Sequence, residues 1–169
     1  MRRAFAILGS AIFLFLAPGI VAGYVPWRIC RWHPGLPLLG TSVFRLIGLL
    51  LLAVGLPVLL DSFARFAVQG LGTPAPIFPT RHLVVSGLFQ YVRNPMYIAV
   101  VSLILGQGFF FGSIGVLEYG IAVGVGFHLF VLIYEEPTLR SSYGHDYQEF
   151  CQHVPRWIPR LQPWRRTES

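Results

Sequence analysis

Residues 43–60 read VFRLIGLLLLAVGLPVLL, a stretch in which Arg45 is the only charged side chain. A helix rises about 1.5 Å per residue, so a run of this length crosses most of the roughly 30 Å hydrocarbon core of a bilayer. Arg45 lies near one end of the run, where its long side chain can reach the headgroup level. The stretch therefore predicts a membrane-spanning helix.

The composition extends this prediction to the whole chain. Of the 169 residues, 54% are hydrophobic and 12% are charged, and the mean hydropathy is +0.62. An average soluble domain has about 25% charged residues. A soluble globule of this size could not hide so much apolar surface. The composition excludes secreted disulfide scaffolds, collagen-like chains and disordered chains.

Apolar runs of similar length occur four times in the chain. They predict an all-α integral membrane helical bundle that forms one domain over residues 1–169. We expect kinks at Pro18 and Pro57, since both lie within spans. The first run also resembles a secretory signal, but no clear A-x-A site follows it, and we expect it to be retained. The predicted spans are residues 4–23, 43–60, 96–111 and 116–134.

The positive charge sets the predicted orientation. All thirteen basic residues are arginine, and the net charge is +6. If both termini are cytoplasmic, ten arginines lie inside and only Arg28 and Arg31 lie in the outer connection 24–42. We therefore expect an inner-membrane protein, in a bacterium, with no nucleic-acid partner. In this topology Cys30 and Cys151 lie on opposite sides and cannot pair within one chain.

Two long polar segments, 72–95 and 135–160, then face the cytoplasm, where a soluble cofactor would be met. The first segment has three prolines near its start, which indicates an ordered extended run. It ends at Asn94 and Pro95, which we expect to be the N-cap and the first turn of the third span. The short turn Gly112–Ser113 joins the third and fourth spans on the outer side.

Glu135 and Glu136 are adjacent carboxylates at the cytoplasmic end of the fourth span. The helix dipole disfavours them there, and each repels the other, so a cation should compensate. One interpretation is a solvated interfacial pair. The other is that one carboxylate binds a cationic or hydroxyl-rich ligand while its neighbour pairs with an arginine such as Arg93 or Arg140.

Other motifs near the membrane have simpler interpretations. Gly106-Gln107-Gly108 indicates close helix packing, or alternatively a backbone that approaches a ligand. We interpret His128 as a buried histidine bonded to a neighbouring helix. Helical spacing of Leu139, Tyr143, Tyr147 and Phe150 predicts one surface helix over 138–150. The tail VPRWIPRLQPW, residues 154–164, suits an aromatic and cationic membrane anchor.

Four motifs in order resemble a known superfamily. They are LVVSGLFQYVRNPMY at 83–97, GQG at 106–108, YEEPTLRSSYGHDYQEF at 134–150 and VPRWIP at 154–159. Together they are similar to the isoprenylcysteine carboxyl methyltransferase and phospholipid N-methyltransferase superfamily of membrane enzymes, over residues 72–160. Asn94 replaces the histidine of enzymes that act on prenylated cysteine, so the Asn-Pro-Met-Tyr form looks closer to phospholipid-type members.

The resemblance implies a helical membrane enzyme that takes S-adenosylmethionine from the cytoplasm and methylates a lipid or another hydrophobic acceptor. It implies no metal. Glu136 is the first choice of the two carboxylates for contact with the cofactor. The positions that the resemblance places at the cofactor are Arg81, His82, Leu83, Val84, Phe89, Arg93, Asn94, Pro95, Met96, Tyr97, Gly106, Gly108, Glu135 and Glu136.

The reaction would be an in-line displacement at the donor methyl, promoted by positioning and by exclusion of water. A carboxylate acceptor needs no base, whereas an amine must first lose a proton, and His128, His82 or Glu135 could take it. His128 and Glu135 are the candidate catalytic groups. Two other classes remain open: a non-enzymatic transporter or assembly subunit, and a haem or quinone protein that uses His82 and His128.

Overall fold

The computed structural model describes residues 16–69, 83 and 85–165, and these ranges contain helices and loops but no strand. Three long helices form the bundle: α3 (Val43–Gln69), α4 (Pro95–Phe111) and α5 (Ile114–Phe130). A π-helical turn, η1 (Gly19–Tyr24), leads into the short α2 (Val25–Cys30) beside them. The all-α prediction is thus confirmed for the described part of the chain.

The sequence predicted that the fourth span ends at residue 134, but the helix continues beyond that residue. It continues through a π-helical turn, η4 (Val131–Glu135), into α6 (Glu136–Tyr143), so that Ile114–Tyr143 is one helical rod of 30 residues. Pro137 lies in the first turn of α6, where its missing N–H costs little, and the wider turn before it keeps the rod continuous.

Among the described residues, two helices are long and apolar enough to cross a membrane, namely Val43–Arg65 and Ile114–Tyr143. The predicted third span, α4, is apolar but shorter, at 17 residues. Most of the predicted first span, residues 4–15, lies outside the described ranges. The described part of this span continues past Gly23, where the sequence predicted its end. Pro26 lies in the first turn of α2, where proline is tolerated, and the helix runs on to Cys30.

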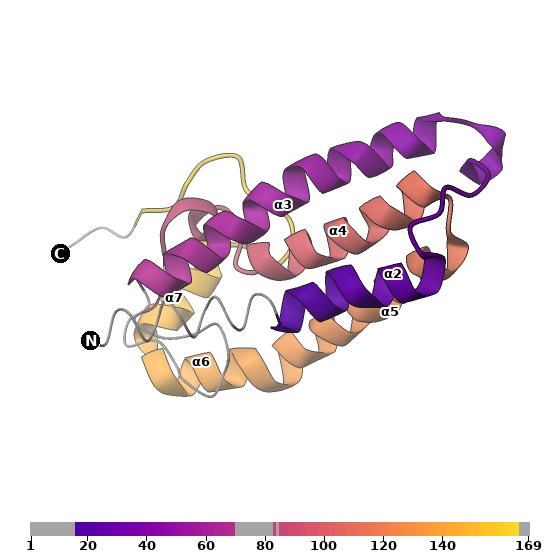
Figure 1. Cartoon of the computed structure of the whole chain (residues 1–169). Coiled ribbons are helices and arrows are strands. Elements are labelled where there is room, and N and C mark those ends of the chain that lie inside the picture. The colour runs from indigo at the N-terminus through magenta and orange to yellow at the C-terminus, as the bar shows by residue number, and fades with distance from the viewer. Residues whose placement is uncertain (1–15, 70–82, 84, 166–169) are drawn as a thin grey trace.

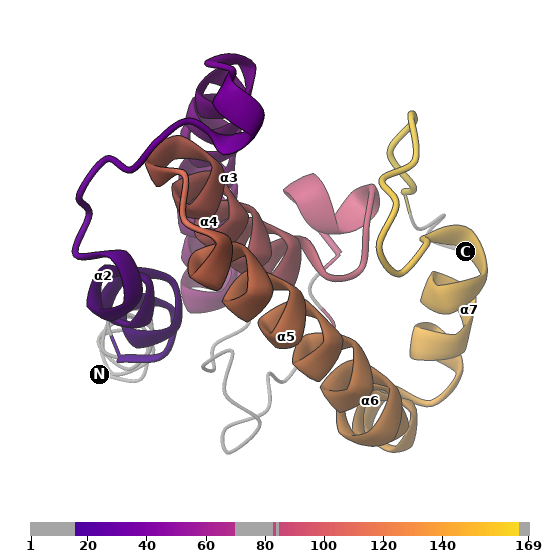
Figure 2. The same cartoon turned by 90° about the vertical axis from the view of Figure 1, so that its right-hand side faces the viewer.

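The helices lie side by side, and α4 packs against both α3 and α5 (Figure 1). The turn at Gly112–Ser113 connects α4 to α5 at one end of the bundle, as predicted, and the loop that follows α2 packs against it. At the other end lie η3 (Gly87–Gln90), α6, α7 (His145–His153) and the C-terminal segment (Figure 1). Figure 2 looks along the bundle and shows η3 next to the C-terminal segment.

Helices α3 and α4 are in backbone contact. A Cβ atom on Gly48 would lie 2.6 Å from the carbonyl oxygen of Gly106, which leaves no room for any side chain. Gly108 is similarly close to Leu117 of α5, where an added Cβ would lie 2.5 Å from a methyl carbon. The packing interpretation therefore accounts for both glycines of the Gly106-Gln107-Gly108 motif.

The buried amide of Gln107 has the partners that its place in an apolar helix requires. It donates to the carbonyl oxygens of Ala22 at 2.6 Å and Leu103 at 3.0 Å, and it accepts from the indole N–H of Trp32 at 2.9 Å. The bonds with Ala22 and Trp32 fasten α4 to the N-terminal helical segment and to the turn after α2, whereas the bond to Leu103 lies within α4.

The predicted single surface helix over 138–150 is wrong. Gly144 separates α6 from α7, with φ 53° and ψ −121°, a conformation open only to glycine. The break folds α7 back, so the predicted apolar residues form a packed cluster instead of a lipid-facing stripe. Its buried members are Tyr147, Phe150 and Val154, and Leu83, Val85, Leu139, Tyr143, Cys151 and Trp164 pack against them.

Candidate active site

The two adjacent carboxylates have different partners. Glu136 is buried, and the guanidinium of Arg156 donates to both of its oxygens, from Nε to Oε1 at 2.6 Å and from Nη2 to Oε2 at 3.0 Å. Arg93 Nη1 adds a third bond to Oε1 at 3.1 Å. Hydrogen bonding to Glu136 raises the pKa of Arg156 above its usual value.

This arrangement confirms that one carboxylate pairs with Arg93, and it rules out a solvated pair. A buried carboxylate needs both opposite charge and hydrogen bonds to offset its lost hydration, and the two guanidinium groups supply them. Both carboxylate oxygens of Glu136 accept hydrogen bonds from the protein's own arginine side chains. Glu136 is therefore less suited than a carboxylate with a free oxygen to bind a ligand.

Glu135 has spare capacity to bind a ligand. Its Oε2 accepts a hydrogen bond of 2.7 Å from the hydroxyl of Tyr97 on α4. Its Oε1 has no hydrogen-bond partner among the described residues. The geometry therefore favours Glu135 over Glu136, the first choice from sequence, as the carboxylate that contacts a ligand.

Arg93 carries a second unsatisfied group in the same place. Its Nη1 also donates to Cys151 Sγ at 2.8 Å, and its backbone N–H donates to the carbonyl of Pro155 at 2.9 Å. Its Nε is buried without a partner in the described part of the chain. A buried donor without an acceptor is costly, so a bound acceptor group would be stabilised there.

Asn94 is the N-cap residue of α4, as predicted, but its side chain does not cap the helix. Asn94 precedes α4, and Pro95 opens the helix as expected, but no cap hydrogen bond forms. Instead, Asn94 Nδ2 donates to the backbone carbonyl of Arg156 at 3.2 Å. The side chain turns away from α4 because the C-terminal segment lies alongside it.

That C-terminal segment lies against the site and contributes Arg156 to it, and its interpretation as a membrane anchor stays a prediction. Its backbone is fastened along residues 90–93: Arg160 N–H donates to the carbonyl of Tyr91, and Trp164 N–H to that of Gln90, both at 3.0 Å. Sequence reasoning missed Arg156 and Trp157 as site residues. The signal was the motif Val-Pro-Arg-Trp-Ile-Pro, whose arginine and tryptophan equally suit an interface.

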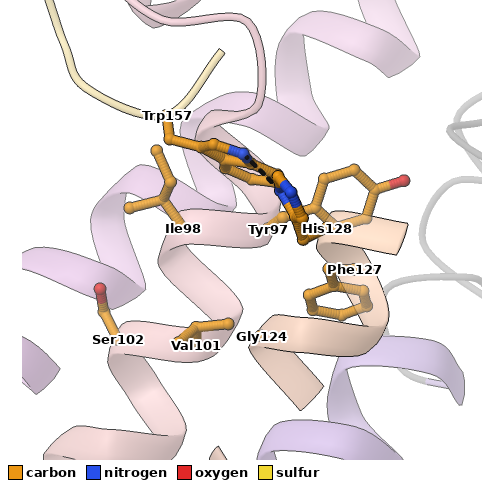
Figure 3. A pocket seen from close by; sticks show the side chains of 8 residues that line it. All are labelled: Tyr97, Ile98, Val101, Ser102, Gly124, Phe127, His128 and Trp157. Carbon is orange, nitrogen blue, oxygen red and sulfur yellow. Dashed lines mark hydrogen bonds between the residues drawn. The ribbon is translucent and has the colours of Figure 1, made fainter. Parts of the chain in front are cut away.

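His128 is exposed, so its interpretation as a buried histidine held by a neighbouring helix is wrong. The indole N–H of Trp157 donates to His128 Nδ1 at 3.0 Å, and the two rings lie 5.9 Å apart. The bond joins the C-terminal segment to α5, across the space that separates α5 from α4 (Figure 3).

A pocket of about 340 Å³ lies beneath this bond, between α4 and α5. The two helices touch closely near their connecting turn, where a Cβ on Gly120 would lie 2.7 Å from Leu105. They separate toward the site, where a Cβ on Gly124 would lie 3.8 Å from Val101. The pocket lining is Tyr97, Ile98, Val101, Ser102, Gly124, Phe127, His128 and Trp157.

Several predicted positions lie elsewhere or are not described. Arg81, His82 and Val84 lie outside the described ranges, as does the predicted extended run at 72–79. Phe89 is buried, with 6% of its surface exposed, Leu83 packs on the α7 cluster, and Met96 packs on the bundle core. Gly106 and Gly108 lie deep in the bundle, more than two helical turns from Tyr97.

Comparison with known proteins adds one finding. A model of the phospholipid methyltransferase family matches residues 43–146, which span α3, α4, α5, α6 and the start of α7. No curated protein and no solved structure matches the chain.

Proposed function

Because the chain belongs to the phospholipid methyltransferase family, we propose that it is an S-adenosylmethionine-dependent methyltransferase that modifies a lipid or another hydrophobic acceptor at the cytoplasmic membrane face. One observation carries the proposal: Tyr97 belongs to both halves of the site. Its hydroxyl binds Glu135 in the charged cluster, and its ring lines the apolar pocket. A polar donor and an apolar acceptor could therefore meet at this residue.

The charged cluster fits the amino-acid end of S-adenosylmethionine. That end carries a carboxylate and an ammonium group. The unpartnered Nε of Arg93 is a donor for a carboxylate, and the free oxygen of Glu135 is an acceptor for an ammonium. We assign these two residues to the cofactor and Arg156 to holding Glu136 and Arg93 in place.

When bound, the cofactor supplies an electrophilic methyl group on a sulfonium. The protein's own residues position the reactants and exclude water from them. Tyr97 orients Glu135, and the Arg93–Glu136–Arg156 cluster holds α4, α6 and the C-terminal segment together. The apolar walls of the pocket exclude water from the reacting groups. Since the free oxygen of Glu135 is assigned to the cofactor, the catalytic role of His128 or Glu135 stays a prediction.

The distribution of arginine supports a cytoplasmic site. Since arginine is enriched on the cytoplasmic side of membrane proteins, we place the site there. Within the described ranges, Arg65, Arg93, Arg140, Arg156, Arg160 and Arg165 lie at the end of the bundle that holds the site, and Arg28, Arg31 and Arg45 lie at the opposite end.

Calorimetric titration of the detergent-solubilised protein with S-adenosylhomocysteine tests the proposal. We expect the parent protein to bind, and Glu135→Gln to bind at least about tenfold more weakly, since one charge-assisted hydrogen bond is lost. Glu118→Gln is the matched control, because Glu118 is exposed near the other end of α5. Labelled methyl transfer to a lipid extract then identifies the acceptor.

The outcomes separate the claims. If the folded parent protein does not bind, the methyltransferase proposal fails, and a transporter, an assembly subunit or a haem or quinone protein becomes the better explanation. If the parent and Glu135→Gln bind equally, the assignment of Glu135 is wrong while the proposed activity stands.

A further inference from the structure

The bond between Trp157 and His128 fixes which nitrogen of the imidazole carries the proton. An indole N–H can only donate, so His128 Nδ1 must accept. In the neutral ring the proton is therefore on Nε2. Within the described part of the chain this Nε2–H has no partner, and His128 is exposed at the edge of the pocket. This Nε2–H group can therefore donate a hydrogen bond to an oxygen atom of a ligand.

The position of His128 along the rod suggests which oxygen. It precedes Glu135 by seven residues, about 10 Å toward the middle of the apolar helix. The headgroup and interfacial layer of a bilayer is roughly 5–8 Å thick on each side. With Glu135 at the outer edge of this layer, His128 lies about 2–5 Å below its inner boundary, where its side chain can reach the ester carbonyl groups that a glycerolipid carries at that boundary.

The pocket below His128 is suited to a hydrocarbon chain. Ile98, Val101 and Phe127 form apolar walls. The polar groups in the lining are the hydroxyl of Ser102 and the tyrosine, histidine and tryptophan side chains already described. At about 340 Å³ the space takes part of one chain and not a complete two-chain lipid.

We propose that His128 is a specificity-determining residue, which donates from Nε2 to the ester carbonyl of an acyl lipid whose chain occupies the pocket. Trp157 fixes the tautomer and covers the pocket. The inference rests on the proposed function and narrows its acceptor to ester-linked lipids over ether-linked ones. Trp157 lies outside the residues that the family model matches.

The test compares two lipids that differ only in the linkage. The probes are a diacyl and a dialkyl-ether phosphoethanolamine lipid with brominated chains, which quench nearby tryptophan fluorescence. Quenching that is lost in Trp157→Phe reports occupancy of this pocket. We expect the parent protein to bind the ester lipid about fivefold to tenfold more tightly, the value of one hydrogen bond.

Three variants assign that preference to one donor. His128→Asn keeps an acceptor for Trp157 but has no donor at the Nε2 position, so the two lipids should bind equally. His128→Gln places an amide N–H near that position and should recover part of the preference. Glu118→Gln, which lies outside the pocket lining near the other end of α5, is the matched control and should retain the full preference.

Several results would overturn the inference: equal binding of the two lipids to the parent protein, no quenching that depends on Trp157, a preference that survives in His128→Asn, or a preference lost in Glu118→Gln. Titration with S-adenosylhomocysteine on the same preparation separates the claims. Ester preference without nucleoside binding would contradict the proposed activity, and nucleoside binding without ester preference would contradict only the role of His128.

Discussion

Tyr97 on α4 donates a 2.7 Å hydrogen bond to Glu135, the residue at which the π-helical turn of the long rod ends. The same phenol ring packs against Phe127 of α5, with the ring centroids 4.7 Å apart. Tyr97 therefore fixes a carboxylate through its hydroxyl and a wall of the pocket through its ring.

These two roles can be separated by Tyr97→Phe, which removes the hydroxyl and keeps the ring. We expect affinity for S-adenosylhomocysteine to fall about fivefold to tenfold, because Glu135 loses its orienting bond. The melting temperature should change little, since the ring contact remains. Tyr119→Phe removes a hydroxyl that binds the Val21 carbonyl far from the site, and it should leave this affinity unchanged. Parental affinity in Tyr97→Phe would show that the hydroxyl does not organise the site.

Arg156→Ala should destabilise the protein by about 2 kcal/mol, because Glu136 stays buried with Arg93 as its remaining ion-pair partner among the described residues. The value is below that for a fully buried pair because the Arg156 side chain is 29% exposed. Thermal unfolding in detergent measures the loss. The exposed Arg165, changed to alanine, is the control and should have no effect. The double variant Arg156→Ala, Glu136→Gln should be no more stable than Arg156→Ala, since the buried Arg93 then loses its carboxylate partner.

Gly48→Ala should destabilise the bundle by roughly 1–3 kcal/mol, because the new methyl group would overlap backbone atoms of α4. Gly126→Ala is the matched control within a helix: an added Cβ there meets nothing within 4 Å. That change should be neutral or stabilising by up to about 1 kcal/mol, as alanine favours helix. Equal melting temperatures for the two variants would contradict backbone contact between α3 and α4.

Gly144→Ala isolates a backbone effect, since an added Cβ has open space around it. The φ of 53° still disfavours any other residue, and we expect a loss of about 1–3 kcal/mol. Limited proteolysis between α6 and α7, together with thermal unfolding, measures it. If the variant is as stable and as resistant as the parent protein, the break at Gly144 does not require glycine.

Sequence reasoning predicted the features that depend on local chemistry. Apolar run length identified α3 and the rod that begins with α5. The adjacent carboxylates at a helix end required a cation, which led to Arg93. The polar amide of Gln107 required partners, and the structure supplies three hydrogen bonds.

Sequence reasoning missed the features that depend on where the chain folds back and on contacts between residues far apart in the sequence. Arg156 lies twenty residues beyond Glu136, and no local pattern distinguishes an arginine that pairs in a site from one that meets lipid headgroups. The apolar spacing around Gly144 continues across the break, so periodicity alone predicted one helix where the backbone makes two. The choice of Glu135 over Glu136 likewise needed the contacts of both carboxylates.

The backbone contact between Gly48 and Gly106 bears on how a substrate can enter. Helices that touch through their main chains cannot slide or part without losing that contact, so α3 and α4 behave as one rigid block. The contact between α4 and α5 is looser at Gly124, so a substrate would enter between these two helices. An acceptor would arrive sideways from within the membrane plane, and the gating motion would belong to the rod of α5 and α6.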